Sequence, residues 1–238
     1  MDKKYIEVKN LSYKYENHLI LDDISFDIEK GDIVSIIGPN GSGKTTLLKN
    51  IIGILKPSSG LIKIDNKNSN EMRSQIAYVP QKFEFDRNIP ITIYEFMAME
   101  KCDNDKHSEK NITKILSEVG LDKVVDEKIG SLSGGQFQRA MIARALLHEK
   151  EILVFDEPAT GIDIVGGYAI YDLIKEINIK RKVTCLIVSH ELNIVNKYSK
   201  YVICINKKLC CFGRPKNIIT PETLKSLYGD TAGLYHGH

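Results

Sequence analysis

The sequence has little excess of charge, with 33 lysines and arginines against 31 aspartates and glutamates and a net charge of +2. Surfaces that bind nucleic acid carry a clustered basic excess, so we expect no nucleic-acid partner. Long apolar runs are also missing, because none approaches the ~20 residues that a helix needs to cross a bilayer. The first residues, Met1 to Tyr5, lack the apolar segment of a signal peptide. We therefore expect a soluble chain.

Cysteine is scarce, with five residues, an odd number, and no C-x-x-C pair. This count favours free thiols in a reducing cytosol over a disulfide framework. Cys210 and Cys211 are adjacent in a predicted strand, where consecutive side chains point to opposite faces. The pair cannot form one metal site by itself, and we expect both to be packing residues.

The composition, 42% hydrophobic and 27% charged, is that of a folded globular protein. Alternating runs at Tyr5–Val8 and Ile24–Ile28 predict antiparallel strands with one wet face, and apolar runs at Ile33–Ile37 and Ile152–Phe155 predict buried strands. Between about 88 and 150 the pattern becomes helical. We predict one α/β domain over 1–238, with a mixed sheet, an N-terminal antiparallel β-subdomain, a core at 1–87 and 151–238, and an inserted helical subdomain.

Further elements follow from local signals. Thr92 has Glu95 at capping-box spacing, which predicts a helix through Met99. A second helix is expected from Ser108, with Gly120 ending it. The remaining predicted elements are strands Leu61–Ile64, Ile76–Val79, Val183–Val188, Tyr201–Ile205 and Lys208–Phe212, helices from about Gly135 to Leu147 and Gly166 to Ile179, and a short helix after Val188.

A glycine-rich loop follows the apolar strand Ile33–Ile37 and precedes a helical pattern. It fits the P-loop spacing of two glycines followed by Lys and Ser/Thr. Its residues are Gly38, Pro39, Asn40, Gly41, Ser42, Gly43, Lys44, Thr45 and Thr46. Glycines let backbone N–H groups approach polyphosphate, Lys44 can reach the β- and γ-phosphates, and Thr45 can ligate Mg²⁺. The alternative is a structural glycine turn that binds no ligand.

Four more motifs occur in a fixed order. Gln81 follows a predicted strand, and Asp156 and Glu157 end a buried one. His190 follows the predicted strand Val183–Val188. The fourth motif lies between Gln81 and Asp156 in the sequence and begins a predicted helix. It consists of Leu132, Ser133, Gly134, Gly135 and Gln136. With the P-loop, these motifs resemble the ATP-binding subunit of ABC transporters over nearly the whole chain.

The chemistry of these residues fits ATP hydrolysis with Mg²⁺. Asp156 would bind the cation, through water, at the edge of the sheet. Glu157 would orient and deprotonate the attacking water. Gln81 offers an amide oxygen to Mg²⁺ or water, and the resemblance implies that His190 contacts the γ-phosphate. Taken alone, the acidic pair is compatible with an exposed turn, Gln81 with a surface glutamine, and His190 with a solvated or core histidine.

Ser133 to Gln136 form a second anion cradle, made of a hydroxyl, glycine N–H groups and a helix N-terminus. The resemblance implies that this cradle faces the nucleotide of a second subunit, in a homodimer formed in ATP or in a pair with a similar chain. Asp163 matches the family's loop that crosses to the partner. The resemblance implies that Tyr15, rather than Tyr13, stacks on adenine, because Tyr15 aligns best with the family's aromatic residue upstream of the loop. Tyr13 fits better as a core residue at the end of a strand.

The resemblance is strongest to bacterial zinc and manganese importer ATPases, in the segments around Gln81, Thr160–Asp163, Cys204–Gly213 and the tail. It implies a peripheral subunit at the cytoplasmic face of the cell membrane, bound to integral permease subunits and served indirectly by an extracytoplasmic metal-binding protein. Zinc is the expected cargo and manganese the next. The residues from roughly Lys82 to Lys101 would line the docking groove. The tails of these ATPases often carry more histidines than the two found here, His236 and His238. The alternative to a metal contact by this tail is a frayed terminus.

Two other functions stay open. The chain could be an exporter subunit, or an importer subunit for another cargo, because an ATPase of this kind never touches the cargo. It could also be a non-transport ATPase of the same superfamily acting on DNA or ribosomes. Those have long coiled coils or two cassettes in one chain, and the stretch between Lys44 and Leu132 is too short for a coiled coil.

Overall fold

The computed structural model describes residues 4–81, 83, 86, 89–100 and 109–229. The tail with His236 and His238, Ser108 and part of the predicted docking segment lie outside these ranges. Within them, no helix combines the length and the apolar character needed to cross a membrane.

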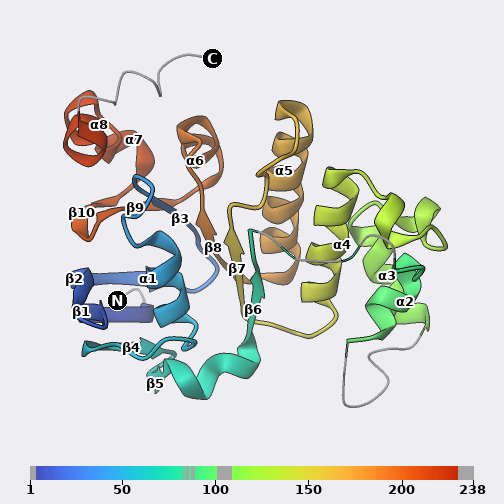
Figure 1. The fold of residues 1–238 in the computed structure, drawn as a ribbon, viewed down its shortest axis with the longest axis horizontal. Coiled ribbons are helices and arrows are strands. Elements are labelled where there is room, and N and C mark those ends of the chain that lie inside the picture. Colours follow the sequence, from blue (N-terminus) through green and yellow to red (C-terminus); the bar gives the residue numbers. More distant parts are fainter. Residues whose placement is uncertain (1–3, 82, 84–85, 87–88, 101–108, 230–238) are drawn as a thin grey trace.

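A small antiparallel sheet with the order β2-β1-β4-β5 lies at one end of the molecule (Figure 1). Its strands are β1 (Lys4–Tyr15), β2 (His18–Glu29), β4 (Ser59–Ile64) and β5 (Lys67–Asn68). Ile6 pairs with Ile28 and Val8 with Phe26, so apolar residues share one face. The predicted N-terminal antiparallel strands are confirmed, and both are longer than the alternating runs alone indicated.

A larger mixed sheet with the order β10-β9-β3-β8-β7-β6 forms the centre. Its strands are β3 (Ile33–Ile37), β6 (Ile76–Val79), β7 (Ile152–Asp156), β8 (Thr184–Val188), β9 (Tyr201–Asn206) and β10 (Lys208–Gly213). Five of them run parallel, and only β10 is antiparallel to its neighbour. All residues of β3, β7 and β8 are buried, as expected for parallel strands covered on both faces.

Each face of the central sheet has its own core. Helix α1 (Lys44–Ile51) and the small sheet pack with Val34, Ile36 and Val154 on one face. Helices α4 (Gly134–Leu146) and α5 (Ile164–Arg181) pack with Leu153 and Phe155 on the other. Alternate side chains of these strands pack into the two cores. Because the strands are parallel, their carboxyl ends lie at one edge of the sheet, and the candidate site residues lie at this edge.

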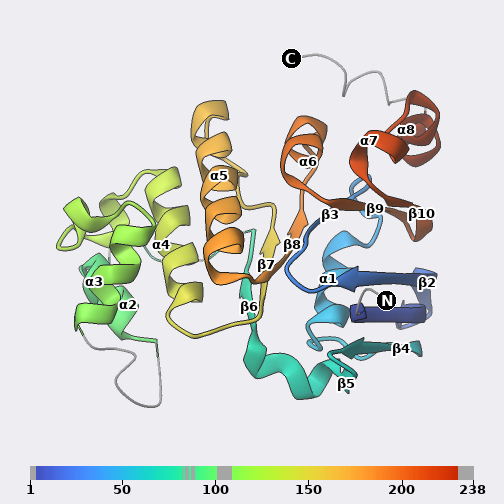
Figure 2. The same cartoon turned by 180° about the vertical axis from the view of Figure 1, so that it is seen from behind.

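Three helices group beyond β6, at the end opposite the small sheet (Figure 2). They are α2 (Ile93–Ala98), α3 (Glu109–Glu118) and α4. Thr92 caps α2 in a capping box with Glu95, and Gly120 has φ 73° just after α3, so both predicted helix signals are confirmed. The helical subdomain that the sequence predicted is present. Its boundaries, about 88–150, stay a prediction.

Some elements were not predicted. They are the 3₁₀ helix η1 (Ser69–Gln75), the short η3 (Asp122–Val124) and η4 (Ile129–Ser131), α7 (Pro215–Ile218) and α8 (Pro221–Tyr228). Thr220 accepts a hydrogen bond from the N–H of Thr223, and Pro221 begins α8, so a start signal for this helix was available in the sequence. The short helix predicted after Val188 is α6 (Leu192–Tyr198).

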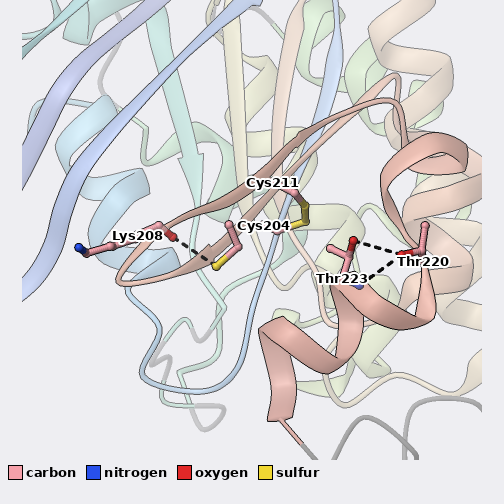
Figure 3. Close-up of a disulfide and its surroundings, with 6 residues drawn as sticks. Cys204, Lys208, Cys211, Thr220 and Thr223 are labelled. Carbon is pink, nitrogen blue, oxygen red and sulfur yellow. Dashed lines mark hydrogen bonds between the residues drawn. A yellow bond between two sulfur atoms is a disulfide. The ribbon is translucent and has the colours of Figure 1, made fainter.

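The cysteines depart from expectation. Cys204 and Cys211 are paired residues of β9 and β10, with Cα atoms 4.9 Å apart, and a disulfide joins them (Figure 3). Directly opposite residues of an antiparallel pair are close enough for such a bond, which a count of cysteines cannot reveal. The expectation of free thiols is wrong for this pair. Cys211 packs against the core, but Cys210 is exposed, so its predicted packing role is also wrong.

Candidate functional site

The P-loop leaves the buried strand β3 and enters α1 through Gly43, which has φ 99°. Its first glycine is packed tightly, because a Cβ on Gly38 would lie 2.1 Å from the carbonyl oxygen of Ile205 in β9. The turn after β9 holds the loop as well, since the N–H of Lys207 donates to the carbonyl of Ser42 at 2.9 Å. The loop is thus fixed by the sheet beside it.

Lys44 is only 8% exposed. Its ammonium donates to the carbonyls of Gly38 at 2.9 Å and Pro39 at 3.0 Å. Burial lowers the pKa of Lys44, and the nearby carboxylates of Glu157 and Asp156 oppose that shift. A cation at the first turn of a helix, inside a curled glycine loop, suits a polyphosphate.

Asp156 ends β7 and is 4% exposed. Its Oδ2 accepts hydrogen bonds from the hydroxyls of Thr45 at 2.9 Å and Tyr78 at 3.2 Å. Burial raises the pKa of Asp156, and these two bonds favour the ionised form. A carboxylate and a hydroxyl from two elements form a set of hard oxygen donors, which fits Mg²⁺.

Side chains that follow three strands lie close to the carboxylate of Glu157. The amide nitrogen of Gln81, after β6, donates to Glu157 Oε2 at 2.7 Å, and Thr160 Oγ1 donates to the same oxygen at 3.1 Å. His190, after β8, places Nδ1 3.7 Å from it. Glu157 has φ 51°, a left-handed conformation that is uncommon for a residue with a long side chain.

Several of these residues line one cavity of about 640 Å³, and Asp156 reaches it through its hydrogen bond with Thr45. It is lined by Ile20, Asn40, Gly41, Gly43, Lys44, Thr45, Thr46, Gln81, Glu157 and His190. The structure therefore brings together residues that are widely separated in the sequence. Ile20, in β2, was not predicted, because an apolar residue between Leu19 and Leu21 gives no signal of a binding role.

Tyr15 does not line this cavity and is 62% exposed at the end of the β1–β2 hairpin. Tyr13 is partly buried and packs against the core between the two sheets. Of the two tyrosines, only Tyr15 has a side chain largely open to a ligand, and its adenine contact stays a prediction.

The second cradle is built at the start of α4. Ser133 Oγ accepts from the N–H of Gln136 at 3.2 Å, and Gln136 Oε1 accepts from the N–H of Ser133 at 2.9 Å, which completes a capping box. A Cβ on Gly134 would lie 3.7 Å from the carbonyl of Gly161. Residues 132–136 are not among those that line the P-loop cavity.

Asp163 caps α5 by accepting a hydrogen bond from the N–H of Gly166 at 3.0 Å. The next two residues, Ile164 and Val165, are 75% and 79% exposed. Within the described part of the chain, Asp163 therefore has a local structural role, and an apolar surface lies beside it.

Comparison with known proteins agrees with this geometry. The family model described as ABC transporter matches residues 21–160. The zinc import ATP-binding protein ZnuC of Rickettsia bellii is 39% identical over 238 residues, which are 100% of this chain and 98% of that protein. ZnuC of Buchnera aphidicola is 38% identical over 224 residues, 94% of this chain and 90% of that protein.

A solved structure shows the same arrangement. The cbiO1 protein of Clostridium perfringens, part of the ABC transporter complex cbiONQ, superposes with a TM-score of 0.81 at 29% identity. The match covers 98% of each chain. The predicted α/β P-loop fold and the predicted resemblance are confirmed, and the chain belongs to the ABC transporter family as an ATP-binding and ATP-hydrolysing subunit.

Proposed function

We propose that this chain is the motor of a bacterial importer for a divalent metal ion, zinc before manganese. The observation that carries the proposal is the cluster at the P-loop cavity, where Lys44, Thr45, Asp156, Glu157 and Gln81 meet. At one edge of the sheet, the cluster combines a loop that can bind phosphate, oxygen atoms that can bind Mg²⁺ and a carboxylate that can accept a proton. The names of the Rickettsia and Buchnera relatives support zinc as the cargo.

In this proposal the loop residues Gly38 to Thr46 bind the phosphates of ATP, with Lys44 supplying the charge. Mg²⁺, held by Thr45, Gln81 and, through water, Asp156, would neutralise charge on the phosphates. Glu157 accepts a proton from the attacking water. The arrangement that supports this role is the convergence of Gln81 and Thr160 on its carboxylate.

His190 is proposed to contact the γ-phosphate, and its position at the end of β8, beside Glu157, supports this role. Tyr15 is proposed to stack on adenine. Its support is exposure at the end of the hairpin whose other strand supplies Ile20 to the cavity. Stacking needs only an accessible aromatic face.

The second cradle, Leu132 to Gln136, is proposed to serve the nucleotide of a partner subunit. Its separation from the chain's own P-loop cavity supports this, because one cavity does not use both cradles. The exposed Ile164 and Val165 beside Asp163 provide apolar area for a homodimer formed in ATP, or for a pair with a similar chain.

The membrane subunits are proposed to dock beside Gln81, at the cytoplasmic face of the membrane. A groove of about 410 Å³ lies there, lined in part by Tyr78, Pro80, Phe83 and Met141. The guanidinium of Arg144 lies over the ring of Phe83, 5.7 Å from its centroid, and is ion-paired with Glu100, so the groove has both an apolar wall and a polar, charged side. Such a groove suits a short amphipathic segment of a permease.

Replacing Ser133 by arginine is expected to reduce ATP hydrolysis by about 10²-fold while the monomer keeps its ATP affinity. The bulky side chain would fill the cradle that serves the partner's nucleotide, and it would not touch the P-loop cavity. The measurements are turnover and ATP calorimetry, with Ser117→Arg on the exposed face of α3 as a matched control. Weaker ATP binding by the Ser133 variant would refute the assignment to the partner.

Deleting this subunit is expected to abolish high-affinity zinc uptake, and then manganese uptake if the complex carries both. The measurement is accumulation of isotopic zinc, manganese and iron in deletion cells, with complementation by the wild-type chain and by Glu157→Gln as the matched inactive control. Normal zinc and manganese uptake beside a defect for an organic solute would overturn the cargo and leave the ATPase mechanism unaffected.

A further inference from the structure

We propose that Thr160 is a positioning residue, which holds the Glu157 carboxylate in the orientation that hydrolysis requires. Two bonds connect the residues: Thr160 Oγ1 donates to Glu157 Oε2 at 3.1 Å, and the N–H of Thr160 donates to the Glu157 carbonyl at 3.2 Å. Both close the turn that follows β7, which contains the left-handed Glu157. The inference rests on the proposed general-base role of Glu157.

The carboxylate is held from one side. Gln81, Thr160 and His190 all approach Oε2, at 2.7, 3.1 and 3.7 Å. Within the described part of the chain, every hydrogen bond and ion pair of this carboxylate goes to that oxygen. The arrangement leaves Oε1 as the oxygen that can accept a proton from water.

Two donors restrain such a group better than one. The terminal torsion of a glutamate is broad, so a single hydrogen bond restrains the carboxylate plane poorly. Both donors are exposed, but Gln81 is long, and its donor has several rotatable bonds behind it. Thr160 is β-branched, has one restricted torsion, and is tied to Glu157 by the backbone bond as well. Its hydroxyl is therefore the better preorganised of the two donors.

The test replaces Thr160 by valine, which keeps the branched shape and removes the hydroxyl. We expect turnover to fall about threefold to tenfold, the range for loss of one hydrogen bond, with KM for ATP and calorimetric ATP affinity unchanged. Thr160→Ser restores the donor and should recover most of the lost turnover. Wild-type turnover in the valine variant, or equal losses for valine and serine, would overturn the inference.

A second comparison places the effect on Glu157 itself. In a Glu157→Gln background, measured by single-turnover hydrolysis, Thr160→Val should reduce the rate by less than about twofold, because groups that act as a unit are not additive. An undiminished fold loss in that background would show that Thr160 acts elsewhere and contradict the inference. Wild-type turnover of Glu157→Gln alone would instead reject the general-base role, so the two failures are distinguishable.

Discussion

Replacing Glu157 by glutamine is expected to leave ATP binding intact and to lower turnover by about 10²–10⁴-fold, the usual contribution of a general base. Glutamine has nearly the same shape and can still accept hydrogen bonds from Gln81 and Thr160, so the loop should keep its conformation. It cannot take a proton from water. The measurements are steady-state hydrolysis and ATP calorimetry, with Glu149→Gln, an exposed glutamate after α4, as the matched control.

The same variant should also accumulate as a dimer in ATP. If two subunits close on nucleotide and reopen after hydrolysis, a subunit that cannot hydrolyse ATP stays closed. Sizing with multi-angle light scattering in saturating ATP measures this directly. Hydrolysis near the wild-type rate would reject the assigned base, and a monomer at saturating ATP would reject the proposed dimer cycle.

Replacing Lys44 by alanine has the largest expected effect on affinity. The ammonium is the only side-chain charge in the loop, and hydrogen bonds to charged groups contribute about 1.5–3 kcal/mol each, so we expect ATP affinity to fall by about 10²-fold or more. The ammonium also donates to the loop carbonyls of Gly38 and Pro39, which alanine leaves without this donor.

The control for this variant is Lys49→Ala, which removes a lysine from the last turn of the same helix. It should bind ATP like the wild type. Melting temperatures of both variants show whether the fold is intact. Unchanged calorimetric ATP affinity in folded Lys44→Ala protein would disprove the P-loop assignment.

Local signals carried most of what the sequence predicted correctly. The capping box at Thr92 and Glu95, the turn glycine Gly120 and the largely apolar runs Ile33–Ile37 and Ile152–Phe155 are each encoded within a few residues. The strand-end positions of the candidate site residues follow from the same patterns. Parallel strands meet at one edge, so the neighbourhood of Gln81 and Glu157 could be anticipated as well.

What escaped prediction depends on partners distant in the sequence or in the fold. The disulfide of Cys204 and Cys211 follows from the register of β9 on β10. Ile20 reaches the cavity because the small sheet packs beside the P-loop. The bond from Thr160 to Glu157 follows from the turn after β7, and nothing in the residue types at these positions indicates it.

The tight packing of the P-loop has a consequence for mutational studies. An alanine at Gly38 would meet a backbone carbonyl at 2.1 Å, and one at Gly43 would meet the Leu21 side chain at 2.6 Å. Gly41 has open space around it but φ 77°, so alanine there costs only about 1–2 kcal/mol of backbone strain. Loss of ATP binding in Gly38 or Gly43 variants would therefore report misfolding as readily as lost phosphate contacts. Gly38 and Gly43 therefore have an architectural role in addition to the role proposed for them in phosphate binding.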